Sequence, residues 1–124
     1  MGIQIPNFPN LFTITGPGSP SVLTNMPRAI EQHVEWITKC ISYLLREKKN
    51  RIEACPKYSK NWLKKVHDAA KKTMFLKTEN SWYQGSNIEG KPVGFIPYSG
   101  GLDKYSKICK EVETNTYEGF LIDN

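Results

Sequence analysis

Residues 11–45 read LFTITGPGSPSVLTNMPRAIEQHVEWITKCISYLL, which places a strand-like run, a loop and a helical pattern in direct succession. Residues 11–15 are rich in β-branched and aromatic side chains and predict a short buried strand. Residues 16–21 contain two glycines and two prolines, a composition typical of a loop. A strand, a glycine-containing turn and a helix in this order are the setting of a dinucleotide-binding turn in α/β proteins.

The helix has clear start signals. Thr24 or Asn25 can cap it, and Pro27 suits its first turn. Apolar residues then recur at spacings of four and three, which predicts one inward face formed by Ile30, Val34, Ile37, Ile41 and Leu44.

The rest of the chain predicts short elements separated by loops. We expect a linker at 50–57, a second helix from Ser59 to about Phe75 and a long loop at 76–92. A strand at 93–98, interrupted by Pro97, a third helix at 103–113 and a last short strand at 119–122 follow. The inward positions of the second helix are Trp62, Val66, Ala69 and Thr73. The whole is an α/β chain, or α+β as an isolated piece, with about three helices and two to three short strands.

The 124 residues suffice for one domain and carry a net charge of +5. Positive charge is concentrated between residues 46 and 77, where eleven Lys or Arg face three acids. Such a block either attracts a polyanion such as nucleic acid or is a solvated helix face, and the second reading is the commoner one.

Three cysteines without Cys-x-x-Cys spacing fit a reducing compartment, and we expect a cytoplasmic protein. No run of apolar residues approaches a membrane span, and no signal-peptide pattern precedes the first strand.

Several patterns imitate known sites without completing them. Residues 85–91 spell Gly-x-x-x-x-Gly-Lys, but Pro92 stands where a P-loop needs Ser or Thr. Gly16-x-Gly18 has Ser21 at the position of the third glycine of a dinucleotide fingerprint. His33 and His67 lack ligand spacing and are interpreted as surface or capping residues. The sequence therefore nominates no catalytic residue and no metal ligand.

Seven stretches in order carry a resemblance: 8–12, 16–21, Asn25-Met26, 30–36, 81–91, Gly100-Gly101 and 117–120. With this order and spacing, the chain resembles the C-terminal quarter of flavin-dependent Baeyer–Villiger monooxygenases of the phenylacetone and cyclohexanone monooxygenase type. The resemblance implies a fragment of a flavoprotein with two dinucleotide-binding domains. That protein uses FAD and NADPH to insert one oxygen atom of O₂ beside a ketone carbonyl, which gives an ester or a lactone.

The resemblance also implies roles for individual residues. Met26, at the helix start, looks like the residue whose backbone meets the flavin, and helix-end N–H groups suit a flavin carbonyl. Trp82 looks like the tryptophan of the mobile control loop that closes on NADP. The residues that would border the ketone pocket are Ser19, Pro20, Ser21, Val22 and Leu23. The rest of the control loop would comprise Ser81, Tyr83, Gly85, Asn87, Gly90 and Lys91.

On this interpretation residues 1–50 complete the FAD-binding domain, and residues 51–124 supply a helix, the control loop and the C-terminal elements of a single partial unit. Two other interpretations stay open. The chain is either a small basic module that binds nucleic acid or another polyanion, or an inactive remnant with an exposed apolar patch. Nucleic acid is disfavoured because the basic block has few aromatic residues to stack on bases.

The family's two Gly-x-Gly-x-x-Gly fingerprints do not occur in these 124 residues. We therefore predict that the isolated chain neither holds FAD tightly nor oxidises a ketone, because the pyrophosphates of both cofactors lack a cradle. The check is the visible spectrum of the chain after incubation with excess FAD and gel filtration, together with NADPH consumption in the presence of cyclohexanone. One flavin retained per chain would contradict the prediction.

Overall fold

A computed structural model describes residues 1–77 and 81–124. Its α-helices are α1 (Met26–Arg46), α2 (Pro56–Ala70) and α3 (Leu102–Thr114), and its strands are β1 (Arg51–Ala54) and β2 (Phe120–Asp123). Three 3₁₀ turns complete the order: η1 (Ser21–Leu23), η2 (Met74–Lys77) and η3 (Trp82–Gln84). The predicted fold class, with three helices and short strands, is confirmed.

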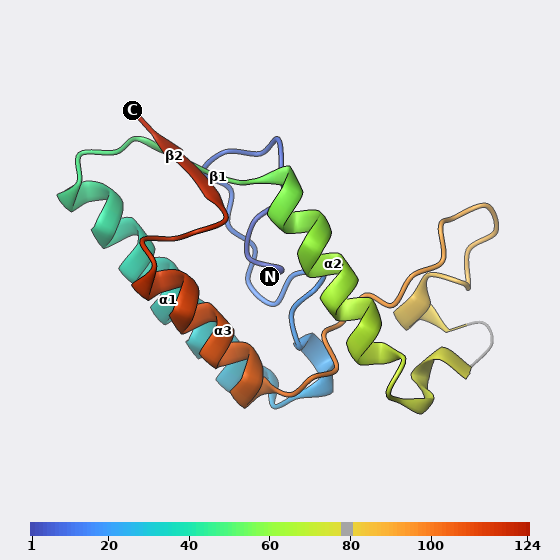
Figure 1. The fold of residues 1–124 in the computed structure, drawn as a ribbon. Coiled ribbons are helices and arrows are strands. Elements are labelled where there is room, and N and C mark those ends of the chain that lie inside the picture. Colours follow the sequence, from blue (N-terminus) through green and yellow to red (C-terminus); the bar gives the residue numbers. More distant parts are fainter. Residues whose placement is uncertain (78–80) are drawn as a thin grey trace.

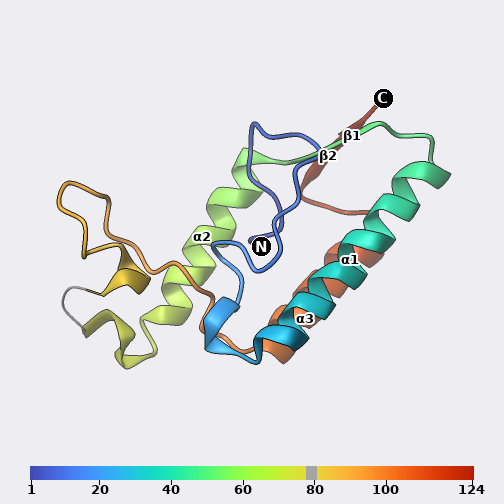
Figure 2. The ribbon, with the colours of Figure 1, turned by 180° about the vertical axis from the view of Figure 1, so that it is seen from behind.

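Helices α1 and α3 lie side by side, and the N-terminal segment fills the space between this pair and α2 (Figures 1 and 2). The two helices are parallel, because contacts advance along both in the same direction. The Trp36 indole N–H donates to the Cys109 carbonyl oxygen at 2.9 Å, and one turn later Lys39 pairs with Glu113 at 3.5 Å. Trp36 is only 2% exposed, so this seam is part of the core.

The sheet has two antiparallel strands, with Ile52 opposite Ile122 and Ala54 opposite Phe120. The last predicted strand is confirmed as β2. Its partner β1 lies in the stretch expected to be a linker, and that expectation is wrong. The charged residue Glu53 breaks the apolar pattern by which the strand could have been predicted. Its side chain is nevertheless buried, and its carboxylate accepts hydrogen bonds from the Asn7 N–H at 2.7 Å and from Arg51 at 2.8 Å. The hydrogen bond from Arg51 is the main cause that lowers the pKa of Glu53.

The other two expected strands, 11–15 and 93–98, do not form ladders in the described part of the chain. Residues 11–15 contribute only isolated backbone hydrogen bonds, such as the Thr13 N–H to the Ile3 carbonyl at 2.8 Å. A strand exists only where a neighbour supplies the other half of its ladder, so composition alone cannot establish one. Part of the expected loop at 76–92 lies outside the described residues.

The helix boundaries follow the cap chemistry. Asn25 caps α1 as predicted, its side-chain oxygen accepting from the Arg28 N–H at 3.2 Å. Helix α2 begins at Pro56 rather than Ser59, because proline is well suited to a first helical turn. The helix ends at Ala70, earlier than Phe75, although Trp62 and Val66 face inward as expected.

The predicted inward face of α1 is mostly wrong. The helix buries a neighbouring stripe, formed by Ala29, His33, Trp36, Cys40 and Leu44. Of the predicted set only Leu44 is buried, while Ile30, Val34 and Ile41 are exposed and Ile37 is intermediate. Apolar residues thus span a broad arc of α1, and the described chain covers only one side of it.

His33 lies at the centre of the buried stripe and is not a surface residue, contrary to the sequence interpretation. Its Nδ1 accepts from the Thr15 N–H at 2.9 Å, so the ring proton is on Nε2, which lies 2.8 Å from the Tyr105 hydroxyl. The hydroxyl in turn donates to the Met1 carbonyl at 2.7 Å. These three hydrogen bonds connect α1 and α3 to the N-terminal segment at two points, Met1 and Thr15.

The buried imidazole predicts a pH dependence. Burial is the main cause that lowers the pKa of His33 from 6.5 to about 4. The unfolded chain therefore binds a proton at His33 at a higher pH than the folded chain does. The free energy of unfolding should fall by up to about 3 kcal/mol as pH drops from 6.5 to 4, and this contribution is fully present above pH 6.5.

Urea unfolding between pH 4 and 7 tests this dependence. His33→Gln should lower stability and flatten the slope in this window. His67→Gln removes an imidazole at an exposed position of α2 and is the matched control for the loss of stability. An unchanged slope in the His33 variant would show that another group is responsible.

Candidate functional site

The loop at 16–21 is held rigidly from within. The Ser19 N–H and hydroxyl both bond the Gly16 carbonyl, at 3.0 and 2.7 Å. The Trp62 indole N–H of α2 donates to the Gly18 carbonyl at 2.9 Å. Gly18 has φ +92°, and a Cβ there would lie 3.2 Å from the Trp62 nitrogen, so glycine is required at this position.

The loop that starts at Ser81 presents an aromatic residue to solvent. Trp82 is 58% exposed and stacks on Tyr83, with ring centroids 4.1 Å apart. The turn η3 ends at Gly85, which is left-handed with φ +70°. The side chain of buried Gln84 anchors the turn through a hydrogen bond to the Phe75 carbonyl at 2.7 Å. An exposed tryptophan on an anchored turn is positioned for contact with something outside the described chain.

These two loops meet around a hollow of about 140 Å³. It brings together Trp82 of the predicted control loop with Ser21 and Val22 of the predicted substrate loop. The complete lining is Thr15, Gly16, Pro17, Ser21, Val22, Trp82, Ile96 and Pro97. The volume is below the roughly 300 Å³ typical of small-molecule sites, so the hollow is one wall of a site rather than a whole one.

Other predicted site residues lie around this hollow rather than in it. Ser19 and Pro20 are buried within the same loop and do not line the hollow, and Leu23 is the last residue of η1. Asn87, Gly90 and Lys91 are exposed in the outer part of the loop. No helix follows residues 85–91 within 92–98, so the Gly-x-x-x-x-Gly-Lys pattern lacks the context of a P-loop.

Met26 is the first residue of α1 and does not line the hollow. Pro27 has no N–H, and the Arg28 N–H is bonded to the Asn25 side chain, so the Met26 N–H is the donor that this helix end offers. The helix has 21 residues, and its N-terminus carries a partial positive charge that favours an electron-rich oxygen.

Sequence reasoning missed Ile96 and Pro97 as members of the site. They were assigned to a strand, and no local signal separates a strand residue from one that lines a hollow between loops. The composition of the pair, one β-branched residue followed by proline, indicated only an irregular edge.

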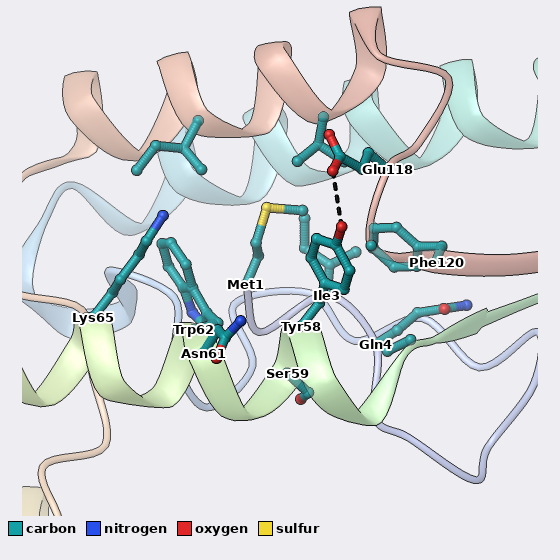
Figure 3. Close-up of a pocket in the computed structure, with 14 residues that line it drawn as sticks. Met1, Ile3, Gln4, Tyr58, Ser59, Asn61, Trp62, Lys65, Glu118 and Phe120 are labelled. Carbon is teal, nitrogen blue, oxygen red and sulfur yellow. Dashed lines mark hydrogen bonds between the residues drawn. The ribbon is translucent and has the colours of Figure 1, made fainter.

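A second hollow, of about 240 Å³, lies between α2 and α3 (Figure 3). Tyr58 and Trp62 border it from α2, and Met1 lies between the two helices. The Tyr58 hydroxyl donates to the Glu118 carboxylate at 2.8 Å across one end of it. None of the residues predicted to bind cofactor or substrate lines this hollow, so it is separate from the candidate site.

Within residues 1–77 and 81–124, no helix combines the length and the hydrophobicity of a membrane span. The same ranges contain no cluster of three or more His, Cys, Asp or Glu side chains that could hold a metal ion.

Known proteins match the chain along nearly all of its length. A cyclohexanone 1,2-monooxygenase of Acinetobacter sp. is 37% identical over 122 residues, or 98% of the chain. An acetone monooxygenase (methyl acetate-forming) of Gordonia sp. (strain TY-5) is 34% identical over 123 residues, also 98% of the chain. No protein-family model matches the chain.

Solved structures agree. The cyclohexanone monooxygenase from Rhodococcus sp. Phi1 bound to NADP⁺ matches 99% of the chain with a TM-score of 0.91 and 35% identity. An oxidized steroid monooxygenase bound to NADP matches 98% with a TM-score of 0.88 and 38% identity.

The chain spans only about a fifth of the proteins it matches, 22% of the Acinetobacter relative and 23% of the Rhodococcus structure. Within that share the match is continuous in sequence and in fold. The chain is therefore similar, over nearly its whole length, to one segment of Baeyer–Villiger monooxygenases of the cyclohexanone monooxygenase type.

Proposed function

We propose that this chain acts as the C-terminal part of an FAD- and NADPH-dependent Baeyer–Villiger monooxygenase. The enzyme would insert one oxygen atom of O₂ beside a ketone carbonyl and release an ester or a lactone. One observation carries the proposal: 99% of the chain superposes on a segment of a cyclohexanone monooxygenase bound to NADP⁺, with a TM-score of 0.91.

The apolar residues on the exposed side of α1 support the proposal that the chain packs against a larger part of the same enzyme. Ile30, Val34, Ile41 and Leu45 recur at spacings that place them on one stripe, and Leu45 is 73% exposed. Leu11 and Ile14 of the expected strand are exposed as well. Contiguous exposed apolar surface of this kind marks an interaction site. We propose that residues 1–50 complete the FAD-binding domain through this surface, and that residues 51–124 add the control loop.

The residues present fit part of the flavin. The Met26 N–H at the start of α1 can donate to a carbonyl at the edge of the flavin ring. The 16–21 loop is a poor phosphate cradle. Pro17 and Pro20 have no N–H, the Gly18 N–H donates to the Ile96 carbonyl, and the Ser19 N–H donates to the Gly16 carbonyl. The cofactor's phosphates would therefore be held by the larger part of the enzyme.

The flavin would supply the redox chemistry with O₂, and this chain would position and shield the reactants. In the proposed enzyme Ser21 and Val22 border the ketone pocket, together with the rest of 19–23. Trp82 closes over the nicotinamide half of NADP, with Gly85 and Gly90 as the points about which its loop bends. The proximity of Trp82 to Ser21 and Val22 across the 140 Å³ hollow supports these roles.

A cytoplasmic enzyme is part of the proposal, and three free thiols support it. The alternative of a nucleic-acid-binding module is disfavoured by the structure of α2. Of the two aromatic residues of α2, Trp62 is 7% exposed and donates to Gly18, so it cannot stack on a base. Tyr58 is exposed, but its hydroxyl is bonded to the Glu118 carboxylate, and one ring makes no stacking platform.

A chimera tests the proposal. In the Acinetobacter cyclohexanone monooxygenase, the matching 22% of the sequence is replaced by this chain. The product should bind FAD and consume NADPH in a ketone-dependent reaction, because the segment provides the same helix end and loops. A folded chimera that binds no flavin would contradict the proposal.

Two matched double variants locate the contact. Ile30→Asp with Val34→Asp puts charges into the exposed apolar stripe and should abolish flavin binding in the chimera. Thr38→Asp with Ser42→Asp has the same spacing on the polar side of α1 and should leave flavin bound. In the isolated chain both pairs should change the free energy of unfolding by only about 0.5 kcal/mol per site, since all four positions are exposed.

A further inference from the structure

Residues 94–98 connect the two loops of the candidate site through main-chain hydrogen bonds. Ile96 is central, because it is bonded on both sides: its N–H donates to the Tyr83 carbonyl at 2.8 Å, and its carbonyl accepts from the Gly18 N–H at 2.9 Å. Tyr83 belongs to the turn that carries Trp82, and Gly18 belongs to the loop at 16–21.

Neighbouring residues reinforce the bridge on each side. The Gly94 N–H donates to the Gln84 carbonyl at 2.9 Å, and the Tyr98 N–H donates to the Ser19 carbonyl at 2.7 Å. The three donors alternate along the segment, as they do along one edge of a strand. A five-residue segment is thus bonded to one loop at its start and to the other at its end.

The far side of each loop is fixed. Gly18 is held by the Trp62 indole at 2.9 Å, and the Tyr98 ring packs on Trp62 with centroids 5.2 Å apart. Gln84 is held by the Phe75 carbonyl. Between these anchors both hydrogen bonds are made by the same residue, Ile96, so a shift of the Trp82 turn would be passed on through it.

We propose that Ile96 is a positioning residue that couples the position of the Trp82 loop to the shape of the loop at 16–21. Ile96 also lines the 140 Å³ hollow beside Trp82 and Val22, so both walls of the hollow move with the same segment. The meaning of this coupling rests on the proposed function: closure over the nicotinamide would reshape the ketone pocket in the same movement.

Amide hydrogen exchange of the ¹⁵N-labelled chain, followed by NMR, tests the coupling without cofactor or substrate. Gly85 and Gly90 form a matched pair, with φ of +70° and +76° in the same loop. An added Cβ meets Lys91 at 3.5 Å at position 85, which is ordinary contact, and nothing within 4 Å at position 90. Alanine at either position therefore introduces mainly left-handed backbone strain.

Gly85→Ala strains the turn to which Ile96 is bonded, so exchange at Gly94, Ile96 and Gly18 should all become roughly tenfold faster. Gly90→Ala should leave the Gly18 amide unchanged. The Cys109 amide of α3 serves as the reference for global opening and should not change in either variant.

Faster exchange at Gly94 and Ile96 with an unchanged Gly18 would overturn the proposal, and so would an equal response of Gly18 to both variants. If Gly85→Ala does not fold, the unmodified chain still tests the coupling. Its amides at four positions should then exchange with similar opening free energies: Gly18, Gly94, Ile96 and Tyr98. Widely different values would overturn the coupling. Because no cofactor is involved, this outcome is independent of whether the chimera is active.

Discussion

Helix α1 carries more apolar surface than the described chain can bury, and the arrangement of the other elements depends on how this surface is divided. One stripe faces α3, where the indole of Trp36 and the imidazole of His33 find buried partners. The adjacent stripe, from Ile30 to Leu45, faces solvent. The tertiary partners decide which stripe is inside, because α3 and the N-terminal segment supply the hydrogen bonds that the buried indole and imidazole need. The parallel alignment of α1 and α3 follows, and with it the position of the N-terminal segment, which His33 holds through Thr15.

The sequence allowed the helices to be predicted because their signals are local. The Asn25 cap, the position of Pro27 and the apolar spacing all lie within α1. Strands depend on partners that can lie far away in the sequence. Strand β1, which contains the charged Glu53, was therefore not predicted, and residues 11–15 were expected to form a strand but have no ladder in the described chain. The buried side of α1 was mistaken for the same reason. Periodicity identifies an apolar arc, but only the tertiary partner decides which part of that arc is covered.

The candidate site shows the same division. Trp82 was singled out from its loop, Ser21 and Val22 were named through the family resemblance, and the structure brings the three to one hollow. Ile96 and Pro97 could not be found in this way, because their part in the site comes from hydrogen bonds to residues far away in the sequence. The role of His33 was likewise invisible, since its partners Thr15 and Tyr105 lie 18 and 72 residues away.

The segment and the proposed enzyme divide the work in a physically consistent way. This chain offers a helix end, an exposed tryptophan and a loop whose Gly18 and Ser19 N–H groups already have partners. In the proposed enzyme, the larger part would bind the phosphates and cover the α1 stripe.

The most direct test of this account is native mass spectrometry of the protein isolated from its source, with detection of bound flavin. The account predicts that this sequence is found within a particle several times heavier than 14.2 kDa that carries FAD. A particle of 14.2 kDa without flavin would contradict it, because the α1 stripe would then have no partner.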